Sequence, residues 1–459
     1  MKLINIPSWN VENAMLMAVD SPVIHSHPLW VFDTELMICS DVLLCSMVLF
    51  ISGLLCSAGG IGGGGIYVSL LMVAGRLVPH DAVPLSKAVV FFGALASLVL
   101  NLRKKLIWPA SSGSTSQALI DYSICRIVVP SALVGTLLGV IFNRLTADWV
   151  LIAMLCMILT LMTGMVTQTA RQQYKEEEAS MSAAASSHDS APSPAAPPAE
   201  ALCMPGPHEK AWLACSEDGK KTRGALLPQD LWLAGVMLLV IVVCGVLRIH
   251  ASECMNELDG TQAPAVPRAC QHPVMSLFPH LVESMTKSHA LGRAIHIALL
   301  AMPISVCVIV AGYYSRHCVA HEGWTNVLLA KYMTMGVVTG CLSGLVGIGG
   351  GLIFSPFFLL MGVDPRIAVA TSSTCVIFTS SSTTLQYLLT DRIIISLAVV
   401  YGSVNLLASW LGTSFVHFLQ DNFHTRKSYI SAIVAAGVFA SLVLCTGKLY
   451  LRLAREPSF

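Results

Sequence analysis

Several long runs of this chain contain no Asp, Glu, Lys or Arg, among them 149–170, 367–390, 393–420 and 428–447. An apolar run of about 18 residues or more is long enough to cross the hydrocarbon core of a bilayer as a helix. Only 12% of the 459 residues are charged, roughly half the share of an average soluble domain. These runs therefore predict an all-α, polytopic transmembrane helical bundle that is integral to a membrane.

Changes in composition divide the chain into six parts. We expect an N-terminal polar extension at 1–36, a first transmembrane repeat at 37–169, a low-complexity polar linker at 170–229, additional transmembrane helices at 230–325 with a polar loop at 251–289, a second transmembrane repeat at 326–448 and a tail at 449–459. The linker is rich in Ser, Ala and Pro, and such a segment cannot bury enough apolar surface to fold alone.

Several classes of function are not indicated. A net charge of +1 lacks the basic face that a nucleic-acid partner needs. The 15 cysteines show no paired CxxC spacing, so no metal site is predicted, although Cys254 and Cys270 in the polar loop can pair if that loop faces an oxidising compartment. No nucleophile–base set and no Gly-Lys-Ser/Thr motif occurs, so we expect neither an enzyme nor a cofactor.

A glycine-rich segment occurs twice in the same order. Placing 339–354 over 52–67 matches Gly53 with Gly340, Leu55 with Leu342 and Gly60-Ile-Gly-Gly-Gly with Gly347-Ile-Gly-Gly-Gly. After one inserted residue, Ala82-Val-Pro-Leu-Ser-Lys faces Ala368-Val-Ala-Thr-Ser-Ser. This agreement predicts two repeats, which we expect to be inverted, each with a broken or re-entrant helix at its glycine cluster.

Glycine clusters inside membrane helices leave amides and carbonyls without helical partners. Such breaks are tolerated where protein or a water-filled cavity satisfies the backbone. A half-helix that begins after the cluster directs its N-terminal amides at that cavity, and amides attract anions. The alternative is that the glycines serve only close helix packing. The candidate substrate-binding glycines are Gly60, Gly62, Gly63, Gly64, Gly65, Gly347, Gly349, Gly350 and Gly351.

Polar residues follow each cluster at membrane depth. Lys87 is a cation in an otherwise uncharged run, so it is either an anion's counter-charge or a side chain that extends to the interface. The hydroxyls of Ser86, Thr371, Ser372 and Ser373 either bind an oxyanion or link neighbouring helices. The hydroxyl-rich stretch 379–384 is a further candidate lining.

The duplicated Gly-x-Gly-Gly-Gly motif and the following Ala-Val-x-x-Ser element, at 82–86 and 368–372, resemble the TauE/SafE sulfite exporter family. The resemblance covers both repeats, but Ser69 stands where the family's motif leads us to expect a proline, and Pro356 keeps it. The family implies secondary export of sulfite, an organosulfonate or a related sulfur anion.

Together these patterns predict a secondary transporter of a small anion that works by alternating access around a midplane site. Its partners would be the anionic solute and the lipid bilayer. The alternative is a non-transporting membrane scaffold or receptor that uses 171–229 to bind a partner. The patterns do not indicate an oligomeric state.

Overall fold

The computed structural model describes residues 40–58, 62–108, 115–186, 228–260, 289–390, 392–422 and 427–455. Within these ranges, 8 helices are long and apolar enough to cross a membrane. The described chain is helical apart from one short antiparallel hairpin. The predicted polytopic helical bundle is therefore confirmed.

The first half contains one broken helix and three long ones. Its elements are α3 (Ser40–Ala58), α4 (Gly64–Val73), α5 (Pro79–Arg103), β1 (Lys105–Trp108), β2 (Thr115–Ala118), α6 (Tyr122–Leu145) and α7 (Asp148–Ser186). Pro79 begins α5, where a missing amide hydrogen costs nothing. Asp121 caps α6 by accepting hydrogen bonds from the backbone amides of Ser123 and Ile124. α7 continues into the polar segment, well past the end of the apolar run.

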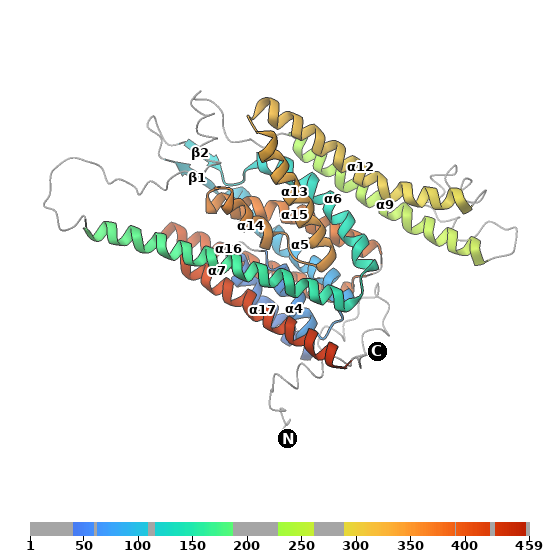
Figure 1. Ribbon diagram of the computed structural model, residues 1–459, viewed down its shortest axis with the longest axis horizontal. Helices are drawn as coiled ribbons and strands as arrows, with labels where there is room; N and C mark the ends of the chain where they lie inside the picture. The colour runs from blue at the N-terminus through green and yellow to red at the C-terminus, as the bar shows by residue number, and fades with distance from the viewer. Residues whose placement is uncertain are drawn as a thin grey trace, which may run out of the picture.

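The second half repeats this order after an inserted helix pair. The pair is α9 (Pro228–Gly260) and α12 (His289–His321), and the repeat is α13 (Asn326–Val346), α14 (Gly351–Leu360), α15 (Pro365–Leu389), α16 (Ile395–Asn422) and α17 (Lys427–Arg455). α9 and α12 pack along each other at one edge of the molecule (Figure 1). The hydroxyl-rich helix α15 is not among the eight apolar spans. Cys270 lies outside the described residues, so the pairing of Cys254 and Cys270 stays a prediction.

The two halves interleave instead of forming separate bundles (Figure 1). α3 packs against α16 of the second half, and its counterpart α13 packs against α6 of the first. α5 contacts α16 in the same way that α15 contacts α6, and α7 packs along α17. Exchanging the halves therefore preserves these helix contacts. Such a core holds both glycine clusters at its centre.

Small residues let α6 and α13 approach closely. A Cβ added at Gly340 would overlap the Ala132 carbonyl oxygen, and one at Gly135 would overlap that of Val337. The Asn143 side-chain amide donates to the Leu345 carbonyl oxygen at 2.7 Å, near the end of the same seam. Close backbone contact of this kind stabilises membrane helix pairs in the absence of a hydrophobic driving force.

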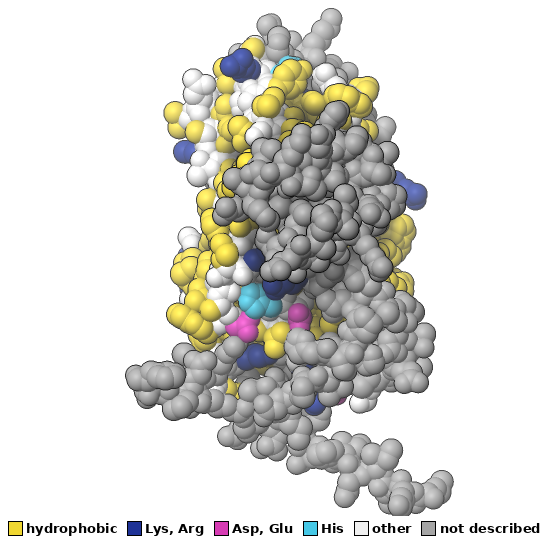
Figure 2. Space-filling model, turned by 90° about the vertical axis from the view of Figure 1, so that its right-hand side faces the viewer, with side chains coloured by type: hydrophobic (Ala, Val, Ile, Leu, Met, Phe, Trp, Pro, Cys, Tyr) yellow, Lys and Arg dark blue, Asp and Glu magenta, His cyan; other side chains and the backbone are white. Residues whose placement is uncertain are grey.

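An ion cluster with a buried arginine and two half-buried carboxylates joins the α9–α12 pair to the core. Arg126 on α6 lies 2.9 Å from Asp230 Oδ2 on α9 and 2.7 Å from Glu322 Oε1, just after α12. The Tyr314 hydroxyl also donates to Asp230, at 2.9 Å. Because each charge has an opposite partner, this cluster is tolerated among apolar helices. Elsewhere the visible described surface is largely hydrophobic with scattered charges, as expected for lipid contact (Figure 2).

Candidate functional site

The two helix breaks contact each other at the centre of the protein. α3 ends at Ala58 and α4 begins at Gly64, while α13 ends at Val346 and α14 begins at Gly351. A Cβ at Gly64 would overlap the Gly349 amide nitrogen, so the two backbones touch with no room for a side chain. Gly60 lies outside the described residues.

Glycine is also required by backbone conformation at both breaks. Gly63 precedes α4 with φ of 58°, and Gly347 ends α13 with φ of 81°. Residues with a Cβ rarely adopt this left-handed conformation, whereas glycine adopts it freely. In each half, the sequence therefore stops one helix and starts the next within a few residues.

A small cavity of about 30 Å³ lies beside the breaks. Residues from both halves line it: Ser57, Gly62, Tyr67, Val90, Gly93, Ala94, Ser97, Gly351, Ser372, Ser373, Val376, Asn405 and Ser409. None of these side chains carries a formal charge. The cavity therefore offers hydroxyl groups, an amide and the starts of two short helices.

Hydrogen bonds link the two halves around this cavity. The Tyr67 hydroxyl donates to Asn405 Oδ1 at 2.9 Å, and the Asn405 amide donates to the Val89 carbonyl oxygen at 2.7 Å. The Ser57 hydroxyl donates to that of Ser409 at 2.7 Å. Our sequence analysis missed these residues. The available signal was Asn405, a side-chain amide in the middle of the charge-free apolar run 393–420.

Ser372 is the cavity residue with an unmet hydrogen-bonding group. Its side chain is fully buried, and its hydroxyl has no hydrogen-bond partner in the described chain. Ser373 also lines the cavity but donates to the Val369 carbonyl oxygen of its own helix at 2.9 Å. Thr371 does not line it, because its hydroxyl accepts the Asp121 amide hydrogen at 3.0 Å.

Ser86 and Lys87 lie on the carbonyl side of the second break and do not line the cavity. Ser86 donates to the carbonyl oxygens of Val83 at 2.8 Å and Gly347 at 3.2 Å. Lys87 is fully buried, and its ammonium donates to Ser343 Oγ at 2.5 Å and to the Ile348 carbonyl oxygen at 2.6 Å. Both residues therefore satisfy backbone groups that the end of α13 leaves without helical partners.

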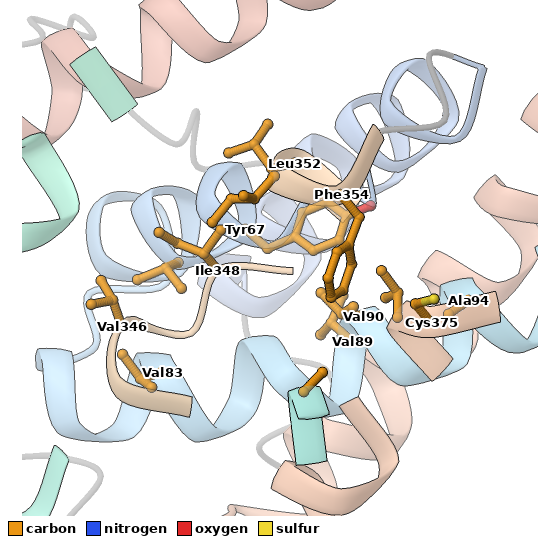
Figure 3. Close-up of a cluster of buried hydrophobic side chains, with 14 of the residues drawn as sticks. Tyr67, Val83, Val89, Val90, Ala94, Val346, Ile348, Leu352, Phe354 and Cys375 are labelled. Carbon is orange, nitrogen blue, oxygen red and sulfur yellow. The ribbon is translucent and has the colours of Figure 1, made fainter. Parts of the chain in front are cut away.

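The candidate glycines have different surroundings. Gly62 and Gly351 line the cavity, whereas Gly64 and Gly349 form the contact between the breaks. Gly65 faces Leu159, with its Cβ position 3.2 Å from that side chain, and a Cβ at Gly350 would lie 2.7 Å from the Phe354 ring. Apolar side chains such as Ile348, Leu352 and Val90 surround the breaks (Figure 3). Close packing is therefore confirmed at Gly64 and Gly349, whereas a substrate-binding role for Gly62 and Gly351 stays a prediction.

The hydroxyl-rich stretch of α15 mostly bonds to its own helix. Thr379 and Ser380 donate to the Val376 carbonyl oxygen at 3.0 and 2.7 Å, and Thr383 donates to that of Thr379 at 2.8 Å. Such bonds satisfy a buried hydroxyl within one helix. None of the residues 379–384 is among those that line the cavity.

A membrane-spanning helical protein with two matching halves, two interrupted helices and a polar cavity between them has the features of a membrane transporter. Comparison with known proteins agrees. The sequence pattern described as "Sulfite exporter TauE/SafE" matches residues 45–203 and 276–440, and the chain belongs to this family.

Named relatives come from Arabidopsis thaliana. Sulfite exporter TauE/SafE family protein 3 is 27% identical over 89% of this chain and 78% of its own length. Family protein 5 is 25% identical over 90% of this chain and 84% of its own length. No solved structure matches significantly. The family match and the apolar spans together place the chain among membrane transporters.

Proposed function

We propose that this transporter carries sulfite or a closely related small sulfur oxyanion, and that the cavity beside the glycine breaks is its binding site. The observation that carries the proposal is the buried, unpartnered hydroxyl of Ser372 at a cavity shared by both halves. A buried polar group without a partner costs roughly 1–3 kcal/mol, which a bound ligand can recover.

The donors around the cavity favour an anion. α14 begins at Gly351, which lines the cavity, so the positive end of that helix dipole is directed toward it. The described lining contains no Asp or Glu that would repel an anion. Uncharged hydroxyls together with a helix N-terminus bind oxyanions without a buried counter-charge.

The size of the cavity favours a small solute. A volume of about 30 Å³ holds roughly two water molecules. A three-oxygen anion needs only a slight expansion of this space, whereas an extended organosulfonate needs much more. We therefore rank sulfite above the organosulfonates.

Contacts of α5 and α15 support alternating access between two inverted halves. The first half of α5 contacts the end of α13, where Lys87 donates to Ser343. The end of α15 contacts the same end of α13, where the Tyr387 hydroxyl donates to the Gly344 carbonyl oxygen at 2.6 Å. The last third of α5 approaches the start of α6 and the first half of α15 at a largely apolar cavity lined by Leu98, Tyr122 and Thr374. These contacts support opposite directions for α5 and α15, as inversion requires. Rocking of the halves would open the site to each side in turn.

Flux through the purified full-length protein tests the proposal. The protein is reconstituted into lipid vesicles, and uptake of radiolabelled sulfite, thiosulfate, sulfate and taurine is compared with protein-free vesicles. We expect saturable sulfite flux and little taurine flux. Absence of flux for every anion would contradict the proposal. A variant lacking 187–227 should retain flux, because a scaffold, but not a transporter, would depend on that linker.

A further inference from the structure

A buried lysine contacts the break of the second half, whereas the described part of the first half's break has no such contact. The Lys87 ammonium lies at the C-terminal end of α13, bonded to Ser343 Oγ and the Ile348 carbonyl oxygen at 2.5 and 2.6 Å. The side chain is fully buried, and the described chain shows no salt bridge to it. Carbonyl oxygens at the end of an interrupted helix carry the negative end of its dipole, so they attract a cation.

The equivalent position in the other half is not cationic. In the repeat, Ser86 matches Ser372 and Lys87 matches Ser373. Ser373 is short, bonds to its own helix and lines the cavity. One side of the paired breaks is therefore an open polar cavity, while the other is filled by a lysine. The asymmetry arises from a single exchange of serine and lysine.

We infer that the Lys87 ammonium is a covalently tethered substitute for a monovalent coupling cation. Broken-helix transporters hold such cations with unwound carbonyls and half-helix C-terminal ends, the kind of group that Lys87 contacts here. A tethered ammonium satisfies those oxygens permanently. Transport by this chain therefore needs no Na⁺ at this position, and removal of the ammonium exposes a site that a free monovalent cation fills.

A binding test does not depend on the proposed function. Purified full-length wild type, Lys87→Ala and Lys87→Met are heated at constant ionic strength in chloride salts of Na⁺, methylammonium or the bulky cation N-methylglucamine. The unfolding midpoint of Lys87→Ala should rise saturably with Na⁺ or methylammonium relative to N-methylglucamine. Wild type should not respond. Lys87→Met should not respond either, because its apolar chain fills the space without creating a cation site.

A flux test rests on the proposed function. Wild-type sulfite flux should be the same in Na⁺ and in N-methylglucamine. Without a small cation, Lys87→Ala should lose about tenfold or more of its flux, since a buried electrostatic contact is lost, and methylammonium should restore most of it. If wild type carries no sulfite, the proposed function fails while the binding test still decides the inference.

Three results would overturn the inference. The first is a folded Lys87→Ala protein whose midpoint responds to small cations no more than that of Lys87→Met. The second is wild-type flux that requires Na⁺. The third applies if Lys87→Ala does not fold. In that case Lys87→Ser, which carries the residue found at the matching position of the other half, is purified in methylammonium. Its failure to fold there would show that no free cation can occupy the position.

Discussion

Gly64 of the first helix break lies directly against Gly349 of the second, with no space for a side chain between the two backbones. This contact makes the two halves depend on each other at their least regular point. It also explains why glycine is needed at Gly64 and Gly349, although neither has a left-handed φ.

Gly64→Ala should therefore be severely damaging. The added methyl group would meet backbone atoms of Ile348 and Gly349, which cannot rotate away as a flexible side chain would. Overpacking typically lowers the free energy of unfolding by about 1–3 kcal/mol. For Gly64→Ala we expect a loss at the upper end of this range, together with loss of flux. Thermal unfolding and flux in vesicles measure both effects.

Gly164→Ala on α7 is the matched control. No atom lies within 4 Å of a Cβ at that position. Because alanine favours helix over glycine by up to about 1 kcal/mol, this variant should be neutral or slightly more stable. Equal behaviour of the two variants would contradict the importance of the contact between the breaks.

Substituting Asn405 should reduce the stability of the protein more than substituting its hydrogen-bond partner Tyr67. Asn405→Leu leaves the Tyr67 hydroxyl without its acceptor and removes a second hydrogen bond from the Val89 carbonyl oxygen, whereas Tyr67→Phe removes one donor from Asn405. Unpartnered buried groups cost about 1–3 kcal/mol each, so Asn405→Leu should lower the unfolding midpoint more. The double variant should be no worse than Asn405→Leu alone. Additive losses would show that the two residues act independently.

Arg126→Met should loosen the α9–α12 pair from the core. The change leaves Asp230 and Glu322 without their cation, and breaking a buried ion pair costs about 3–5 kcal/mol. Arg126→Lys keeps the charge but loses the forked geometry, so its loss should be intermediate. If Arg126→Met lowers the free energy of unfolding by less than about 1 kcal/mol, the ion cluster does not have a structural role.

Gly340→Leu should separate α6 from α13. The Gly340 position faces the Ala132 backbone, and a leucine there cannot fit without moving one helix. We expect poor yield of monodisperse protein by size-exclusion chromatography. Gly312→Leu on α12, where the Cβ position meets no atom within 4 Å, should behave like wild type. If Gly340→Leu also behaves like wild type, α6 and α13 do not make the close backbone contact described above.

The sequence alone predicts the helices and their breaks, but not which candidate residues line the cavity and which bond to the backbone. Long charge-free runs and duplicated glycines depend on local chemistry, so α4 and α14 were predicted as short half-helices. Whether Lys87 faces the cavity or the carbonyls behind it depends on how α5 packs against α13, which no local pattern encodes. Asn405 and Tyr67 come from different halves, and only the interleaved fold brings them together.

Ser372→Ala provides the most direct test of the central claim, that the cavity beside the breaks binds the transported anion. The Ser372 hydroxyl has no hydrogen-bond partner in the described chain, so its removal should leave the unfolding midpoint unchanged or raise it. Thr384→Val is the control, because Thr384 also has a buried, unpartnered hydroxyl on α15 but does not line the cavity.

The measurement is the KM of sulfite flux in reconstituted vesicles. A hydrogen bond to a charged group contributes about 1.5–3 kcal/mol, so Ser372→Ala should raise KM about tenfold or more, while Thr384→Val should leave it unchanged. An unaltered KM for Ser372→Ala, in a protein that folds and carries sulfite, would place the anion site elsewhere.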